Sequence, residues 1–189
     1  MEKIKDTNSE LQLSENIILT IKESNVNKKA LRILSILSLL SILIPVVMLV
    51  YLTQSAEGLQ FGFIISITVF ILAFGYFMRL YLWNKYGQEV FIINKNEFML
   101  YYDYGYFKDY QHQCHYGVIN ILVQYNGKLK KMTPKLFNNI RSDESFYIVF
   151  FVDDKIVESK ALVNIQTIWR MTQYLDKISS LQNFLYKSK

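Results

Sequence analysis

Two long uncharged segments dominate the first half of the chain. No charged residue occurs between Arg32 and Glu57, or between Glu57 and Arg79, although 20% of all residues are charged. Residues 33–52 form the first segment, and fourteen of these twenty residues are Leu, Ile or Val. As a helix, twenty residues rise about 30 Å, which matches the hydrocarbon core of a bilayer. This segment therefore predicts a membrane-spanning helix.

The second uncharged segment covers residues 61–82 and ends at Trp83, whose amphipathic ring suits a membrane interface. We predict transmembrane helices over residues 30–53 and 61–83, joined by an external turn over residues 54–60. The alternatives are a buried hairpin in a soluble protein and a signal peptide. A signal peptide starts nearer the N-terminus and has an apolar stretch of about 7 to 15 residues, whereas here a polar segment, residues 1–29, comes first.

Basic residues flank the two predicted helices unevenly. The turn between the helices contains no Lys or Arg, whereas the opposite ends carry several. Since short cytoplasmic segments carry the excess of Lys and Arg, we expect both termini in the cytoplasm. The residues that determine this topology are Lys28, Lys29, Arg32, Arg79 and Lys85.

Small residues recur on both predicted helices. Ser35, Ser38 and Ser41 are spaced by three, and Gly62 and Ser66 by four. Small residues allow close helix packing in lipid, and a polar pore lining is the alternative. No Asp, Glu, Lys or His lies at the middle of either segment, which argues against a proton relay or an ion-coupled transporter. Whether the hairpin is only an anchor or forms a pore stays open.

The two remaining parts of the chain have the patterns of a folded domain. In residues 1–29, apolar residues at 11, 13, 17, 19 and 21 follow period two, which predicts a strand that pairs with the later domain. After Asn84 the composition becomes charged and aromatic over about 105 residues, enough for one domain. Expected strands cover residues 90–93, 98–102, 106–111, 118–125, 128–132, 145–152 and 155–163.

Turn and helix signals complete this domain. Asn126-Gly127 and Asp153-Asp154 are short turn signals between strands. From Ile165 to Leu185, apolar residues recur near every 3.6 residues, and Asn164 is the candidate N-cap of the amphipathic helix they predict. The expected fold class is a membrane helical hairpin plus a mainly-β (α+β) domain: a small antiparallel barrel or sandwich with a C-terminal helix.

The residues at the start of this domain suggest a family. Gly87, Glu89, Phe91 and Ile93 form a GxExFxI-like pattern, and a strand hairpin, Gly105, the run at residues 118–121 and a closing helix follow it. This order resembles bacterial pleckstrin-homology-like (PH-like) domains. The whole layout resembles their YcxB-like membrane form, with an N-terminal strand, a two-helix hairpin and a PH-like domain, here residues 84–189. The resemblance covers nearly the whole chain, and it implies a protein of the cytoplasmic membrane face without known catalysis.

Basic residues in the domain are candidates for an anionic-ligand or lipid face. They are Lys128, Lys130, Lys131, Lys135 and Arg141. Each such cation contributes about 1 kcal/mol of attraction near an anionic leaflet. Alternation along a strand puts Lys131 opposite Lys128 and Lys130, which favours a solvated face instead. The net charge of the chain is +5, and part of it flanks the membrane segments. This is too little clustered positive charge to bind a nucleic-acid backbone, so we expect no nucleic-acid partner.

Two further clusters carry chemistry-bearing side chains. His112, Cys114 and His115 offer three zinc-type donors without a fourth, and a strand would direct His115 away from the other two. Tyr102, Tyr104 and Tyr106 alternate and either stack on a ligand or fill a β core. The sequence has no glycine-rich phosphate loop, no HExxH and no nucleophile elbow. We therefore predict no catalytic residue, no metal site, no cofactor and no enzymatic activity.

The function that fits these patterns is a non-enzymatic membrane protein whose cytoplasmic PH-like domain is a binding or assembly module. The expected partners are the lipid bilayer, a protein or a second copy of the chain, and a small-molecule ligand. Two alternatives remain. One is a membrane-perturbing defence effector whose β domain senses a ligand such as a nucleotide, and the other is an immunity protein against a membrane-directed toxin.

Overall fold

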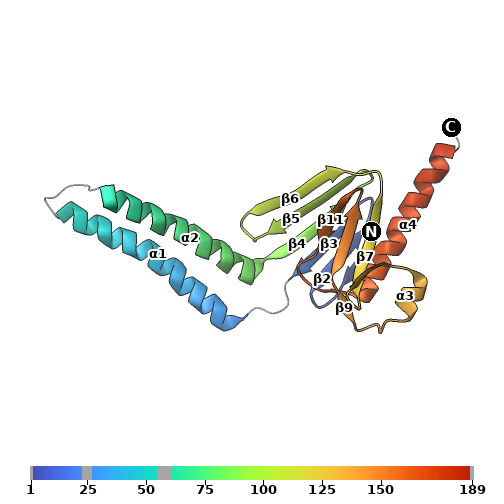
Figure 1. Cartoon of the computed structure of the whole chain (residues 1–189), viewed down its shortest axis with the longest axis horizontal. Coiled ribbons are helices and arrows are strands. Elements are labelled where there is room, and N and C mark those ends of the chain that lie inside the picture. Colours follow the sequence, from blue (N-terminus) through green and yellow to red (C-terminus); the bar gives the residue numbers. More distant parts are fainter. Residues whose placement is uncertain (1, 23–26, 55–60, 188–189) are drawn as a thin grey trace. The chain divides into compact units, whose positions relative to one another are not determined.

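The computed structural model describes residues 2–22, 27–54 and 61–187, and the residues divide into two compact units (Figure 1). The β unit contains residues 1–24, 88–103 and 107–189, and the hairpin unit contains residues 25–87 and 104–106. The N-terminal segment thus belongs to the same unit as the C-terminal domain, although the whole hairpin separates them in the chain.

The hairpin unit is built on two long helices, α1 (Lys28–Gln54) and α2 (Phe61–Tyr86). The prediction of two helices is confirmed, and both are long and apolar enough to cross a membrane. Helix α1 buries Ser38, Ser41 and Pro45, whereas α2 buries none of its residues. Their large apolar side chains are therefore mostly exposed, as expected of surfaces that face lipid. Residues 55–60 of the predicted external turn lie outside the described residues.

The first sheet of the β unit has six strands in sequential order, all antiparallel. Its strands are β1 (Glu2–Lys5), β2 (Ser9–Leu13), β3 (Ile17–Lys22), β4 (Gln88–Ile93), β5 (Glu97–Asp103) and β6 (Lys108–His115). Strand β3 pairs with β4 from Ile17↔Ile93 to Lys22↔Gln88. The predicted pairing of the N-terminal segment with the later domain is confirmed, but that segment forms three strands where we expected one.

Period-two alternation explains why the N-terminal segment joins the sheet. Strands β2 and β3 alternate between buried and partly exposed positions, because successive side chains point to opposite faces. Leu11, Ile17, Leu19 and Ile21 are fully buried. On β4, Ile93 is the cross-strand partner of Ile17, Phe91 is that of Leu19, and Glu89 is that of Ile21. The apolar side chains of this short segment are therefore buried only when the segment pairs with the later strands.

The second sheet has the order β11-β10-β7-β8, and a two-stranded ladder joins β9 to β12. The strands are β7 (Ile119–Tyr125), β8 (Lys128–Lys131), β9 (Ser145–Phe146), β10 (Ile148–Val152), β11 (Lys155–Glu158) and β12 (Val163–Asn164). The predicted strands at 145–152 and 155–163 are thus each divided in two. The predicted turn between β7 and β8 is confirmed: Asn126 and Gly127 have φ of 52° and 70°, as a type I′ turn requires.

An aromatic cluster joins the two sheets. Phe91 and Phe98 come from the first sheet and Phe150 from the second, and their ring centroids lie 4.9 to 6.4 Å apart. All three side chains are fully buried. This cluster is the centre of the core.

Helix α4 (Ile165–Lys187) packs against β2 and β12. The predicted cap is confirmed, since Gln166 N–H donates to Asn164 Oδ1 at 2.8 Å. Ile168 and Met171 are fully buried on its packed face, whereas the side chains from residue 179 onward lie outside the described set. The short α3 (Pro134–Asn138) is capped by Thr133. The structure is thus a helical hairpin joined to an antiparallel β unit with a C-terminal helix, as expected, and the PH-like assignment stays a prediction.

Candidate functional site

The candidate site of the β unit is a pocket where one end of the first sheet meets α4. The β2–β3 loop, the β4–β5 turn, the residue after β6 and α4 enclose about 270 Å³. Small-molecule sites usually have volumes of roughly 300 to 1,000 Å³, so this pocket suits a small ligand. Its lining residues are Ser14, Glu15, Ile17, Ile93, Asn94, Lys95, Tyr116, Tyr174, Leu175 and Ile178.

Strand ends and one helix face supply the apolar part of the pocket. Ile17 and Ile93 are cross-strand partners at the end of the β3–β4 ladder, and both are buried. Leu175 and Ile178 lie on α4 with a spacing of three, which places them on one helix face. These four side chains give a ligand an apolar surface to cover.

Two tyrosines hold the loops around the pocket in place. The Tyr116 hydroxyl donates to the Asn94 carbonyl at 2.6 Å, and the Tyr174 hydroxyl donates to the Ser14 carbonyl at 2.7 Å. Burial raises the pKa of the Tyr116 phenol, so this group remains a protonated donor. The pocket walls are therefore organised before any ligand arrives.

Asn94 supplies an acceptor that the protein itself does not use. Its N–H donates to the Glu97 carbonyl at 2.8 Å, but its buried side-chain Oδ1 has no hydrogen-bond partner among the described residues. An unsatisfied buried acceptor costs about 1 to 3 kcal/mol. This cost falls within a pocket wall whose other lining is largely apolar, so the pocket favours an apolar ligand.

Glu15 and Lys95 place one charge of each sign at the pocket. Both side chains are exposed and line it. This site is not visible in the sequence, because its residues come from four separate segments. In the sequence, Asn94 and Lys95 fall between two expected strands, and Tyr174 falls within the expected amphipathic helix.

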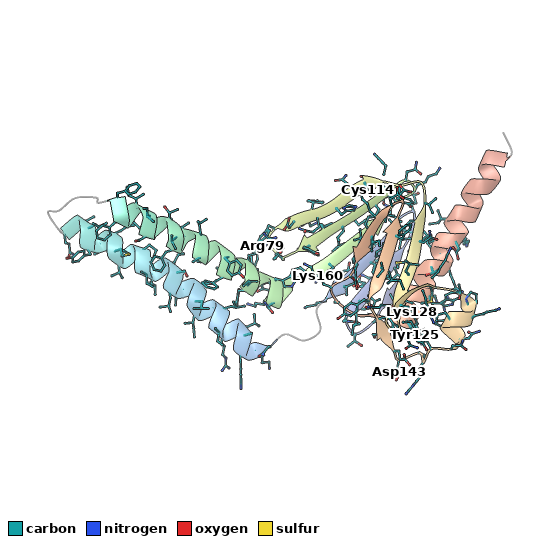
Figure 2. The ribbon with its side chains drawn as sticks, in the orientation of Figure 1. Arg79, Cys114, Tyr125, Lys128, Asp143 and Lys160 are labelled. Carbon is teal, nitrogen blue, oxygen red and sulfur yellow. The ribbon has the colours of Figure 1, made fainter. Side chains whose placement is uncertain are left out.

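The predicted basic residues are spread over three elements. Lys128, Lys130 and Lys131 are all exposed on β8, Lys135 lies in α3 and Arg141 in the loop that follows it. Figure 2 labels Lys128 beside Tyr125 at the β7–β8 turn.

Two of these basic residues already have partners in the β unit. Lys130 Nζ lies 4.9 Å from the centroid of the Tyr125 ring, and Arg141 forms a 3.3 Å ion pair with Asp143. The five cations therefore lie on β8, α3 and the loop after α3, and at least two of them contact other residues of the β unit.

The small residues of the hairpin have different environments. Ser38 and Ser41 are buried, and Ser41 Oγ donates to the Leu37 carbonyl at 2.8 Å. Gly62 is exposed, and a Cβ built there would meet no atom within 4 Å. Gly62 thus makes no close helix contact among the described residues, and its packing role stays a prediction. Ser66 Oγ instead donates to the carbonyl of Gly62 at 2.9 Å within its own helix.

The predicted topology residues lie at the helix ends that are remote from the turn. Lys28, Lys29 and Arg32 are in the first turns of α1. Arg79 and Lys85 are both inside α2, which continues to Tyr86 and so beyond the predicted end at residue 83.

The histidine and cysteine cluster lies on β6, a longer strand than the predicted one at 106–111. His112 is opposite Leu100, Cys114 is opposite Phe98 and His115 is opposite Glu97. Figure 2 labels Cys114 near the end of this strand. Within the described ranges, no three His, Cys, Asp or Glu side chains form a group that could hold a metal ion.

Comparisons with known proteins identify no relative. No protein-family model, curated protein or solved structure matches this chain.

Proposed function

We propose that this protein is a non-enzymatic membrane protein whose β unit is a binding and assembly module at the cytoplasmic face of the bacterial inner membrane. The observation that carries the proposal is the β3–β4 ladder. Lys22 and Gln88 are cross-strand partners, and α1 and α2 occupy the chain between them. The membrane hairpin is thus an insertion between two hydrogen-bonded strands, which ties both of its ends to one folded unit.

This insertion supports a single-sided topology. Strands that belong to one sheet cannot lie on opposite sides of a bilayer, so residues 2–22 and 88–187 share a compartment if the hairpin spans it. The basic residues at the helix ends favour the cytoplasm as this compartment; they are Lys28, Lys29, Arg32, Arg79 and Lys85.

We expect protease added to intact spheroplasts to leave the β unit uncut, and protease added to inverted vesicles to cut it. Cleavage in spheroplasts would contradict the placement.

The PH-like fold is part of this proposal. Two antiparallel sheets and a C-terminal helix that packs on β2 and β12 support it. An experimental structure of the full chain, compared strand by strand with PH-like domains, tests it. A strand order in the second sheet that no such domain shares would contradict the family.

The pocket supports a small-molecule ligand. Full-length protein in nanodiscs is incubated with a bacterial small-molecule extract, washed and analysed by native mass spectrometry. We expect wild type to retain one compound, and Leu175→Trp to lose it because the indole fills the cavity. Asn94→Leu makes the pocket wall more apolar at nearly constant volume and should alter retention. Gln124→Leu, at an exposed position of β7, is the matched control. No retained compound in wild type, or equal retention in all variants, would contradict the ligand role.

A groove between α1 and α2 supports the assembly role. It encloses about 260 Å³ and is lined by Ser35, Ser38, Leu39, Ile42, Phe74, Met78 and Tyr81. Ser38 is 4% exposed, and its Oγ has no hydrogen-bond partner among the described residues. Small residues such as Ser35 and Ser38 let helix backbones approach closely in lipid, so we expect a helix of a second copy of the hairpin to pack into this groove.

The assembly role is tested by the oligomeric state in nanodiscs. We expect wild type to form oligomers and Ser38→Leu, which fills the groove, to be monomeric. Thr68→Leu, on an exposed position of α2, should behave like wild type. A monomeric wild-type protein at all concentrations would exclude assembly through this groove.

A further inference from the structure

The far end of α2 carries a dense group of cations and amphipathic rings. Figure 2 labels Arg79 on this helix, and Trp83 and Lys85 follow it. The three residues after β5, at 104–106, belong to the same unit as the helix. We call the group the interface cluster; its members are Arg79, Tyr81, Trp83, Lys85, Tyr86, Tyr104 and Tyr106.

Tyr104 contacts two successive turns of α2. Its hydroxyl accepts a hydrogen bond from Arg79 Nε at 3.1 Å, and the Arg79 guanidinium carbon lies 5.4 Å from the ring centroid. The Trp83 and Tyr104 ring centroids are 5.3 Å apart. Because Arg79 and Trp83 are four residues apart, they share one helix face, and Tyr104 covers both.

Tyr106 reaches the last residue of the same helix. Its ring forms an edge contact with Tyr86 at 5.8 Å between centroids. Gly105 makes this approach feasible, since it has φ of +85° and a Cβ there would lie 3.2 Å from the Tyr86 Cβ. Residues 104–106 therefore contact α2 between residue 79 and residue 86.

Lys85 is surrounded by aromatic rings of the same helix. Its Nζ donates to the Tyr81 hydroxyl at 3.1 Å and lies 5.4 Å from the Tyr81 ring centroid and 4.9 Å from that of Tyr86. Aromatic rings and phenol hydroxyls stabilise a cation without cancelling its charge. The ammonium group is thus held in place and still attracts an anion.

The position of the interface cluster along α2 determines how deep the cluster lies in the membrane. The uncharged segment ends at Met78, and the eight residues from Arg79 to Tyr86 rise about 10 Å along the helix axis. The headgroup layer on one side of a bilayer is roughly 5 to 8 Å thick, since the whole bilayer exceeds its core by about 10 to 15 Å. Tyr and Trp concentrate at that level. The cluster therefore occupies the headgroup layer when α2 spans the membrane.

We propose that the interface cluster binds the phosphate of an anionic phospholipid headgroup. Lys85 supplies the positive charge, and Tyr106, which is 77% exposed, lies among the headgroups. Arg79 and Trp83 are positioning residues, because through Tyr104 they hold residues 104–106 at this depth. The segment between β5 and β6 is thus a third membrane contact of the chain besides its two helices.

The depth of Tyr106 is tested by fluorescence quenching. In full-length protein that carries Cys114→Ser, Tyr106→Cys is labelled with a fluorophore, and Val69→Cys, an exposed position near the middle of α2, is the matched control. Nanodiscs contain phosphatidylcholine with a nitroxide on its headgroup. We expect strong quenching of the fluorophore at position 106 and weak quenching at position 69, because position 69 lies in the hydrocarbon core when α2 spans the membrane. Equal quenching at both positions would overturn the placement of residues 104–106 in the headgroup layer.

The headgroup preference is tested by native mass spectrometry of full-length protein from nanodiscs with equal phosphatidylglycerol and phosphatidylcholine. We expect wild type to retain phosphatidylglycerol about fivefold over phosphatidylcholine, the ratio for one cation near an anionic surface. Lys85→Gln should bring the ratio close to one, Lys85→Arg should keep it high, and Lys128→Gln should leave it unchanged. No enrichment in wild type, or an unchanged ratio in Lys85→Gln, would overturn the proposal.

Discussion

The carboxylate of Glu89 accepts a hydrogen bond from the backbone N–H of Lys160 at 2.8 Å, although 71 residues separate them in the chain. Glu89 lies on β4 between its cross-strand partners Ile21 and Tyr102, and it is 2% exposed. The Lys160 ammonium group lies 4.0 Å from the centroid of the Tyr102 ring. This contact ties the first sheet to the segment that connects β11 with β12.

Glu89→Ala is expected to destabilise the β unit strongly. Hydrogen bonds to charged groups contribute about 1.5 to 3 kcal/mol, and the substitution also removes the acceptor of the Lys160 amide. We therefore expect the free energy of unfolding to fall by about 2 to 4 kcal/mol, as measured by denaturant titration of full-length protein. Glu158→Ala, at an exposed position of β11, should change it by less than about 0.5 kcal/mol. Similar losses in both variants would contradict a specific role of Glu89.

Phe150→Ala should open a cavity at the centre of the core. Its ring lies 4.9 Å from Phe91 and 5.3 Å from Phe98, and such truncations cost about 3 to 5 kcal/mol. Chemical denaturation measures the loss. Tyr147→Ala, where the side chain is 38% exposed, serves as the control and should cost much less. A loss below about 1 kcal/mol in Phe150→Ala would show that the two sheets do not meet at this residue.

Two glycines with positive φ should respond differently to alanine. Gly127→Ala adds a Cβ in open space, so only the left-handed conformation costs free energy, about 1 kcal/mol. Gly105→Ala has the same conformational cost and also crowds Tyr86. We expect a larger loss of stability for Gly105→Ala, and reduced quenching at position 106 in that variant. Equal losses would mean that residues 104–106 do not depend on the close approach to α2.

Tyr116 should make stability depend on alkaline pH. Burial raises the pKa of its phenol in the folded state, so the folded protein holds this proton more tightly than the unfolded chain. The stabilisation is fully present below the unfolded pKa of about 10 and is lost as the pH rises through the folded pKa. Denaturation midpoints measured from pH 8 to 11 should fall with pH in wild type and fall less in Tyr116→Phe. An identical pH dependence in both proteins would place Tyr116 in a solvated environment.

Sequence patterns predicted the local features well. The uncharged segments at residues 33–52 and 61–82 correspond to α1 and α2, the Asn126-Gly127 turn has the expected φ angles, and Asn164 caps α4. Each of these features depends on residues that are close together in the chain. The N-terminal segment was only partly predicted, because its three strands are stabilised by pairing across 65 residues of intervening sequence.

The ligand pocket and the interface cluster could not be predicted in this way. The pocket gathers Ser14, Asn94, Tyr116 and Tyr174 from separate segments. In the interface cluster, Tyr104 looked like one of three alternating tyrosines of a strand, yet it contacts Arg79 instead. A residue pattern reports local period and polarity, but it does not report which distant side chain completes a hydrogen bond.

By itself the sequence determined that two helices are apolar and long enough to span a membrane, because length and hydropathy along a single segment decide that property. It also determined the alternating strands and the capped C-terminal helix. Only the tertiary structure decided that β3 pairs with β4 and that Glu89 holds Lys160. Such contacts close long loops, and many burial and hydrogen-bond energies together must offset the entropy of closure.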